Sequence, residues 1–159
     1  MIKKENAMKK ILLLLGLCCA MALTTLAQKV TEIDGVYYKN STPYSGLYTS
    51  TFDSGQTKFT VTLKNGLKNG EMRVYFENGK LNEIRHYAEN EMDGIWTTYN
   101  EQEVQVGLAN YKNGKKHGEW KVWDDNGSLI YEMNYVEGEK SGTWKKYNSE
   151  GELLSERTF

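Results

Sequence analysis

The chain has 159 residues, which suits a single domain, and it carries 20 basic and 21 acidic side chains for a net charge of −1. This balance disfavours nucleic-acid binding, which normally requires a strongly basic face. Both cysteines lie side by side at residues 18 and 19, inside an N-terminal apolar run, so no disulfide or cysteine metal site is expected after that run.

Residues 1–27 have the layout of a secretory signal peptide. Four lysines and one glutamate accompany an apolar run over residues 11–26, and the small residues Thr25 and Ala27 mark a cleavage site before Gln28. The run is shorter than the roughly 20 residues that a transmembrane helix needs. We therefore expect export to the periplasm or the medium, with an N-terminal membrane anchor or a lipoprotein signal as alternatives. Cleavage would leave 16 basic and 20 acidic residues, a net charge of −4.

The remaining chain repeats with a period of 24 residues. Glycines recur at Gly46, Gly70, Gly94, Gly118 and Gly142. With each glycine counted as position 0, position 2 holds Tyr48, Met72, Trp96, Trp120 and Trp144. Position 5 holds Thr51, Tyr75, Tyr99, Trp123 and Tyr147, and position 17 holds Leu63, Tyr87, Tyr111, Tyr135 and Phe159. This periodicity predicts an N-terminal half-repeat or cap at 28–45 and five repeats at 46–69, 70–93, 94–117, 118–141 and 142–159.

Each repeat predicts two antiparallel strands and two turns. A short aromatic strand follows the glycine, and Asn78-Gly79 is typical of the hairpin turn that ends it. Apolar residues then alternate, as in residues 129–135, which is the pattern of a half-buried strand. A second turn with glycine at position 20 leads into the next repeat. The 11 tyrosines, the single proline and the lack of helical periodicity after residue 27 agree with an all-β fold.

Residues 70–79 (Gly-Glu-Met-Arg-Val-Tyr-Phe-Glu-Asn-Gly) and 118–127 (Gly-Glu-Trp-Lys-Val-Trp-Asp-Asp-Asn-Gly) resemble the MORN repeat. The closest variety is the bacterial one, some members of which are named as antitoxin components of toxin–antitoxin systems. The resemblance covers 46–159 and implies an elongated, single-layer, twisted antiparallel sheet of tandem β-hairpins. An antitoxin role would require a toxin that acts outside the cytoplasm, since we expect export.

Two repeats depart from the pattern. Repeat 1 has Tyr48 and Thr51 in place of the recurring Trp and Tyr, which suggests a cap. Repeat 3 has Glu103 at position 9 in place of the turn glycine, and the Leu and Glu that follow in other repeats are missing. We therefore expect an altered hairpin in repeat 3 and regular hairpins in repeats 2, 4 and 5.

No catalytic constellation is evident. His86 and His117 occupy different repeat positions and are interpreted as surface residues. Residues 124–127 (Asp-Asp-Asn-Gly) suit a hairpin turn better than a calcium loop, because the acidic spacing and the terminal Glu are missing. A carboxylate pair is conceivable for glycoside hydrolysis, but the repeat pattern favours structural hydrogen bonding for Glu83, Glu132 and Glu156. We expect no enzymatic activity, no cofactor and no metal site.

Lysines cluster near the second turns, where they would either attract anionic lipid headgroups, as attributed to some eukaryotic MORN proteins, or protect an exposed edge. They are Lys64, Lys68, Lys112, Lys115, Lys116 and Lys140. We expect the tryptophans at position 2 to pack against the tyrosines at position 17. The row at position 5 should face the other way and forms the candidate binding surface: Tyr75, Tyr99, Trp123 and Tyr147. The predicted function is an exported protein-binding scaffold, with a carbohydrate- or envelope-binding module and an anionic-lipid binder as alternatives.

Overall fold

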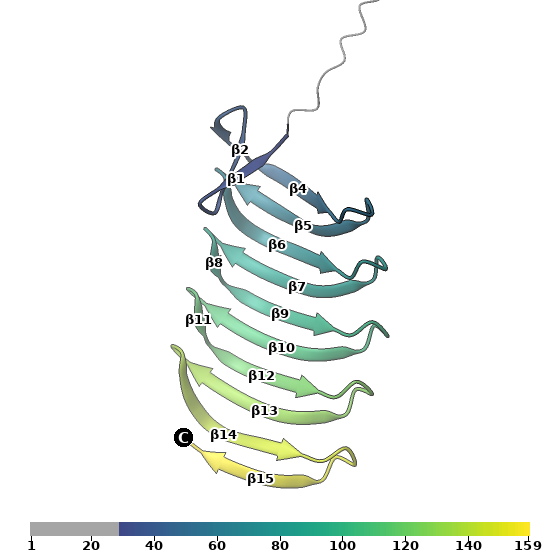
Figure 1. Ribbon diagram of the computed structural model, residues 1–159. Coiled ribbons are helices and arrows are strands. Elements are labelled where there is room, and N and C mark those ends of the chain that lie inside the picture. The colour runs from purple at the N-terminus through teal and green to yellow at the C-terminus, as the bar shows by residue number, and fades with distance from the viewer. Residues whose placement is uncertain (1–28) are drawn as a thin grey trace, which may run out of the picture.

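The computed structural model describes residues 29–159, and this part of the chain folds into fifteen β-strands. They form a three-stranded sheet at the N-terminal end and a 12-stranded antiparallel sheet that contains the rest. Figure 1 shows the hairpins stacked one after another along the long sheet. Residues 29–159 contain no helix with the length and hydropathy needed to span a membrane. The predicted all-β fold of tandem hairpins is confirmed, while the expected signal peptide, residues 1–27, lies outside the described residues.

The strands follow the chain in order along the long sheet, because each hairpin pairs with the next. The N-terminal sheet consists of β1 (Thr31–Ile33), β2 (Val36–Lys39) and β3 (Thr42–Pro43). The long sheet consists of β4 (Gly46–Thr51), β5 (Thr57–Lys64), β6 (Leu67–Tyr75), β7 (Leu81–Ala88), β9 (Gly94–Tyr99), β10 (Gln105–Lys112), β12 (Gly118–Trp123), β13 (Leu129–Val136), β14 (Glu139–Tyr147) and β15 (Leu153–Thr158). At the second turns, the short strands β8 (Glu91–Met92) and β11 (Lys115–Lys116) pair with β7 and β10.

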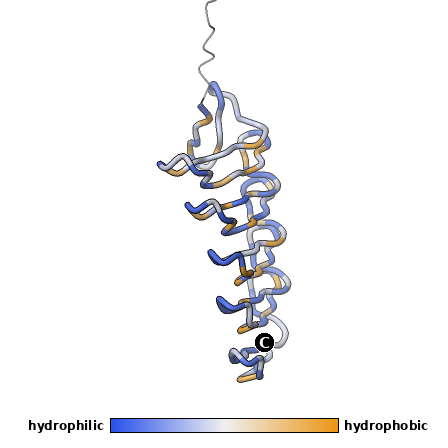
Figure 2. The backbone as a smooth tube through the Cα atoms, turned by 90° about the vertical axis from the view of Figure 1, so that its right-hand side faces the viewer, coloured by the Kyte–Doolittle hydropathy of each residue, from blue (hydrophilic) through white to orange (hydrophobic). Residues whose placement is uncertain are grey.

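Strand pairing determines which repeat positions share a face of the sheet. In repeat 4, Trp120 lies across from Met133, and Lys121 lies across from Glu132. Neighbouring residues of a strand point to different faces, so positions 2 and 15 share one face and positions 3 and 14 share the other. Between repeats the same alternation holds, with Leu108 across from Lys121. Seen from the side in Figure 2, the repeats follow one another as hooked turns, and the N-terminal end is thicker than the rest.

The first turn of each repeat is a tight loop closed by two backbone hydrogen bonds. In repeat 4 the N–H of Asp124 donates to the carbonyl of Ser128 over 2.9 Å, and the N–H of Gly127 donates to the carbonyl of Asp124 over 3.0 Å. The Asp124 carboxylate also accepts the N–H groups of Asn126 and Ser128. Gly127 has a φ of 86°, a left-handed conformation that glycine adopts at little cost.

Repeat 3 forms the same first turn, so the expectation of an altered hairpin is wrong. The N–H of Asn100 donates to the carbonyl of Val104 over 3.0 Å, and the N–H of Glu103 donates to the carbonyl of Asn100 over 2.9 Å. Glu103 takes the left-handed conformation of the missing glycine, with a φ of 65°. The turn survives because the Asn100 carboxamide supports it as Asp124 does in repeat 4, and because one left-handed residue costs only about 1–2 kcal/mol.

The second turns form a regular hydrogen-bond series of their own. The N–H at position 20 of one repeat donates to the carbonyl at position 22 of the preceding one, over 2.8–2.9 Å. The four pairs are Gly66 to Tyr44, Asn90 to Lys68, Gly114 to Met92 and Gly138 to Lys116. Each repeat is therefore joined to its neighbour at the second turn as well as along the strands.

The N-terminal sheet packs on repeats 1 and 2, where the buried core lies. The core consists of Tyr37, Val61, Leu63 and Met72, whose exposed fractions are 7%, 0%, 2% and 8%. Asn90 holds the cap in place, since its side chain donates to the carbonyl of Gly35 over 3.0 Å and accepts the N–H of Lys68 over 2.8 Å. Within residues 29–159, the N-terminal sheet thus forms a second layer over one end of the long sheet.

Candidate functional site

One face of the long sheet carries a continuous ladder of aromatic rings, and we call it the ladder face. Adjacent ring centroids along the ladder lie 4.9–5.5 Å apart, and the rings are tilted or edge-on to one another. The ladder runs through Tyr87, Trp96, Tyr111, Trp120, Tyr135, Trp144 and Phe159. The prediction that position 2 packs against position 17 is thereby confirmed.

Each tryptophan of the ladder is also held by a hydrogen bond. The indole N–H of Trp120 donates to the carbonyl of Asn110 over 3.0 Å. Trp96 and Trp144 make the same bond to position 16 of the preceding repeat, over 3.1 and 3.0 Å. A half-buried indole needs such a partner, so the bond fixes the ring and joins two repeats.

Cationic side chains cover the ladder where it meets water. The ammonium of Lys116 lies 4.5 Å from the ring centre of Trp120 and 4.9 Å from that of Tyr135. Lys140 repeats this arrangement one unit further on, at 4.5 Å from Trp144. Such side chains shield apolar rings with their methylene groups and attract the ring faces with their charge. The second-turn lysines at position 22 thus have a structural role that their sequence positions did not reveal.

Burial favours the neutral form of two tyrosine side chains, one in the ladder and one in the N-terminal core. Burial raises the pKa of Tyr111, and the neighbouring Tyr87 adds to the effect. Burial also raises the pKa of Tyr37 in the N-terminal core. Desolvation disfavours the charged phenolate, so these rings remain uncharged well into the alkaline range.

The predicted binding row lies at the ends of β6, β9, β12 and β14, and its side chains are half-buried: Tyr75, Tyr99, Trp123 and Tyr147. A register shift just before the first turn accompanies each of them. The hydroxyl of Tyr147 donates to the Glu132 carboxylate over 2.8 Å, and this bond, more than desolvation, raises the pKa of Tyr147. Glu132 lies on the face away from the ladder, so the row borders that opposite face. Binding of a partner by this row stays a prediction.

The opposite face is polar and laced with ion pairs. Lys121 lies 2.7 Å from Glu119 and 3.8 Å from Glu132, and Arg73 lies 2.6 Å from Glu71. The pKa of Lys121 is raised mainly by its hydrogen bond to Glu119, and the negative charges of Glu119 and Glu132 add to the shift. Two of the three recurring glutamates thus form structural pairs, since Glu132 contacts Lys121 on this face and Glu83 pairs with Arg85 on the ladder face.

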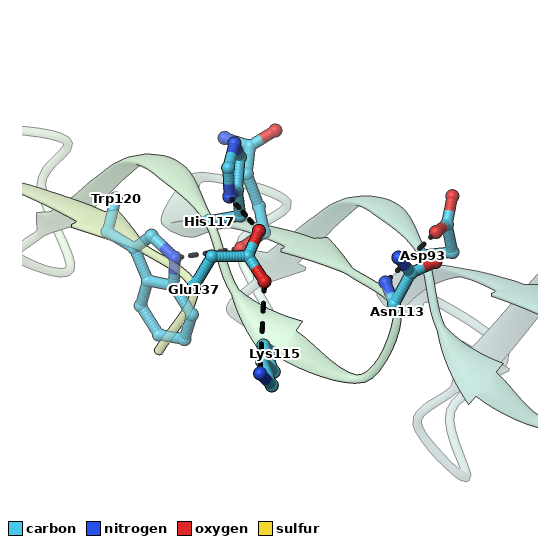
Figure 3. A network of polar contacts seen from close by, with 7 residues as sticks. Asp93, Asn113, Lys115, His117, Trp120 and Glu137 are labelled. Atoms are coloured by element: carbon cyan, nitrogen blue, oxygen red, sulfur yellow. Dashed lines mark hydrogen bonds and ion pairs between the residues drawn. The ribbon is translucent and has the colours of Figure 1, made fainter. Parts of the chain in front are cut away.

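Both histidines lie at junctions between repeats. Figure 3 shows His117 beside Glu137, with Nδ1 3.4 Å from the carboxylate, while Lys115 approaches the same carboxylate to 3.8 Å. One repeat earlier the residue equivalent to His117 is Asp93, which accepts the N–H of Asn113 over 3.2 Å. Position 23 therefore contacts the next second turn. Within the described part of the chain, no group of three or more His, Cys, Asp or Glu side chains is placed to hold a metal ion.

A shallow groove of about 400 Å³ lies on the ladder face near the C-terminal end of the sheet. It is lined by residues of β13, β14 and β15, among them Tyr131, Trp144, Lys146, Ser155, Arg157 and Phe159. This group lies outside the candidate binding surface that the sequence predicts. A comparison of positions 13 and 15 across the repeats would have found it, because Ser155 and Arg157 in repeat 5 stand where repeat 2 has Glu83 and Arg85.

This architecture defines a tandem β-hairpin repeat protein. The family profile described as MORN repeat variant matches residues 68–89, 116–137 and 140–159, so the chain contains stretches that match this repeat. No curated protein sequence matches it. Among solved structures, the crystal structure of the GtfA/B complex bound to UDP and GlcNAc aligns with 84% of this chain at 11% identity and a TM-score of 0.30. The chain spans 24% of that protein's length.

Proposed function

We propose that the chain is an exported, non-catalytic MORN-repeat scaffold that binds a protein partner along its long sheet. The observation that carries this proposal is that, within residues 29–159, the second layer ends at repeat 2 and leaves both faces of repeats 3 to 5 without a cover. Several apolar side chains are left exposed on the face away from the aromatic ladder there, including Ile95 (49%), Val136 (47%) and Leu154 (57%). Such side chains can serve as apolar anchors for a partner that lies along several repeats.

The opposite face has the composition of a protein interface. Half-buried tyrosines and Trp123 border it, and ionic groups such as Lys121 and Glu132 surround them. Aromatic residues are enriched among the side chains that dominate binding energy, and a polar rim usually surrounds them. Repeat proteins also commonly use an extended surface rather than a single pocket to bind partners.

Affinity capture from envelope extract with residues 28–159 tests this proposal. We expect Trp123→Ala to reduce recovery of a specific partner at least tenfold while the fold is retained. Val122→Ala is the matched control, because Val122 is the preceding residue of the same strand and points to the ladder face. Equal recovery with both variants, or no specifically retained protein with the unmodified chain, would contradict a partner site on the opposite face.

Export is supported by the sequence of residues 1–27, with its lysines, apolar run and small residues before Gln28. We expect the mature protein to begin at Gln28 and to be found outside the cytoplasm. N-terminal sequencing together with intact mass measurement checks both points. Recovery of a protein that retains residues 9–27 would contradict cleavage.

A further inference from the structure

Repeats 2 and 5 share an arginine on the ladder face but differ in its neighbour. In repeat 2, Arg85 at position 15 is ion-paired with Glu83 at position 13, and its guanidinium lies 5.2 Å from the ring centre of Trp96. In repeat 5, Arg157 occupies the same position, but Ser155 replaces the glutamate. Arg157 lies 4.9 Å from the ring centre of Phe159 and has no carboxylate partner among residues 29–159. Repeat 2 thus places a carboxylate beside this arginine, and repeat 5 has no carboxylate at the equivalent position.

The groove opens at this place. Ser155 and Arg157 of β15, with Phe159 directly after that strand, line one side of it, and Tyr131 and Trp144 contribute ring surface from the neighbouring strands. Lys146 adds a second cation, 5.7 Å from the ring centre of Tyr131 and across the strand pair from it. Three aromatic rings and the cations Lys146 and Arg157 therefore line a cavity of about 400 Å³, and its lining is completed by Lys145 and Glu156, which lie across the strand pair from each other.

We propose that this groove binds an acidic sugar, with the carboxylate of a uronic acid residue taking the place beside Arg157 that the Glu83 carboxylate takes beside Arg85. The carboxylate would accept hydrogen bonds from the guanidinium, the geometry for which arginine is best suited. The flat apolar face of the sugar ring would lie against Tyr131 or Trp144. This site is on the ladder face and does not depend on the protein partner proposed for the opposite face.

Two features favour this ligand over other anions. The internal reference group is a carboxylate, not a phosphate, because Glu83 fills the equivalent place in repeat 2. The groove is also shallow and walled by rings, which suits a flat ring-shaped ligand with few polar anchors. An acidic peptide would supply the carboxylate without the flat ring.

Calorimetric titration of residues 28–159 with a galacturonate trimer tests the proposal, with a neutral galactose trimer, triglutamate and inorganic phosphate as comparison ligands. We expect the galacturonate trimer to bind at least tenfold more tightly than the other three. We also expect its affinity to fall with added salt, because the contact is between exposed charges. Amide NMR shifts should localise to β13, β14 and β15 and include the indole N–H of Trp144.

Three variants decide whether the site is the one proposed. Ser155→Glu should rebuild the ion pair of repeat 2 within the chain and weaken galacturonate binding by tenfold or more, although no cation is removed. Ser155→Gln is its matched control, with similar bulk and no charge, and should weaken binding much less. Arg157→Gln should also lose tenfold or more, whereas Arg73→Gln on the opposite face should leave the affinity unchanged.

Each other outcome overturns the assignment. Binding of triglutamate or phosphate as tightly as galacturonate would show that the groove selects charge without a sugar ring. Equal losses in Ser155→Glu and Ser155→Gln would show that bulk, not a carboxylate, blocks the groove. Absence of galacturonate binding by the folded protein would rule out the site, and the protein-capture experiment would be unaffected.

Discussion

The two ends of the long sheet solve the same packing problem in different ways. Repeats 1 and 2 lie under the N-terminal sheet and have an aliphatic core, in which Val61 and Leu63 are almost completely buried. Repeats 3 to 5 have no such cover in the described structure, and their ladder face consists of stacked rings bordered by lysine and arginine. The difference indicates that the second layer, rather than the hairpin, decides which side chains a repeat of this sheet needs.

The physical reason lies in what each kind of side chain tolerates. An aliphatic residue such as Leu63 gains most when it is removed from water, about 25 cal/mol per Å² of apolar surface, so it belongs under a cover. A tryptophan or tyrosine has an apolar body and a polar end, so it can be stable when half-buried. The indole N–H of Trp120 finds a carbonyl, and Lys116 lies over the ring. An uncovered sheet is thus stabilised by amphipathic residues.

The largest expected effect comes from breaking the ladder in the uncovered half. Trp120→Ala removes a ring that has two aromatic neighbours, a lysine above it and a hydrogen bond to Asn110. We expect this variant to lower the free energy of unfolding by about 3 kcal/mol. This is the lower end of the range for a large aromatic residue, because Trp120 is only half-buried. Trp123→Ala should cost clearly less, since Trp123 belongs to no ring stack among residues 29–159. Urea unfolding followed by circular dichroism measures both.

Trp120→Phe separates the contributions of the ring and the hydrogen bond. It keeps the stacking with Tyr111 and Tyr135 and removes only the indole N–H, so its cost should lie well below that of Trp120→Ala. Equal, large losses for Trp120→Ala and Trp123→Ala would mean that both rows are core. The opposite-face row would then lose its support as a binding surface.

The junction of the cap with the long sheet gives the next largest effect. A methyl group at Gly66 would lie 2.6 Å from a Val36 methyl and 2.9 Å from the Tyr37 carbonyl, in a residue with a φ of 80°. We expect Gly66→Ala to lower the free energy of unfolding by about 2–3 kcal/mol, combining left-handed strain with displacement of the cap. Gly114→Ala is the matched control at the same repeat position, with a similar φ of 74° and nothing within 4 Å of the added methyl. Its cost should be about 1 kcal/mol.

Hydrogen exchange sharpens this test. Displacement of the cap by Gly66→Ala should expose the amides of β5 and β6, whereas Gly114→Ala should leave them protected. Identical costs for the two variants would show that the N-terminal sheet contributes little, and the contrast between the covered and uncovered halves would fail.

Much of this fold could be predicted from the sequence, because the same pattern of strand and turn residues occurs in five successive repeats. The period of 24 fixed the strands, the turns and the packing of position 2 against position 17. It also located the departures from the pattern without explaining them. Leu63, Met72 and Asn90 differ from their counterparts in later repeats because the cap covers or contacts them, and the sequence of residues 28–45 alone does not show where the cap folds.

The candidate sites were less predictable, for a physical reason. Cation–ring contacts such as Lys140 over Trp144 depend on where a long side chain bends, which periodicity does not determine. The groove arises from what Ser155 lacks relative to Glu83, and this difference gains meaning only when Arg85 is seen paired and Arg157 is seen without a carboxylate. The prediction of an altered hairpin in repeat 3 is wrong because Glu103 takes the left-handed conformation and the Asn100 carboxamide accepts the N–H groups of Gln102 and Val104, contacts that the repeat pattern does not reveal.

A smaller effect concerns that left-handed residue in the uncovered half. Glu103→Gly removes the cost of holding a side chain at a φ of 65°, so we expect a gain in stability of roughly 1 kcal/mol. Gly127→Glu, at the equivalent turn of repeat 4, should lose a similar amount. Chemical denaturation of both variants checks the pair. A large loss in Glu103→Gly would show that the glutamate side chain itself holds the turn.

The smallest effect is a pH dependence that distinguishes the ladder from exposed tyrosines. Burial raises the pKa of Tyr111 above its ordinary value of 10.0, so the unfolded chain releases this proton at a lower pH than the folded chain does. The stability that the neutral Tyr111 side chain contributes is therefore fully present below pH 10 and is lost as the pH rises toward the folded-state pKa. Tyr111→Phe keeps the ring between Trp96 and Trp120 and removes the titrating group. Its stability should therefore fall less steeply above pH 10 than that of the unmodified chain, as measured by urea unfolding at pH 8 to 11. Tyr111→Phe should still lose some stability above pH 10, because burial also raises the pKa of Tyr37 under the cap. Identical slopes for the two proteins would mean that the Tyr111 phenol is fully hydrated, and that the ladder is more open to water than its half-buried rings indicate.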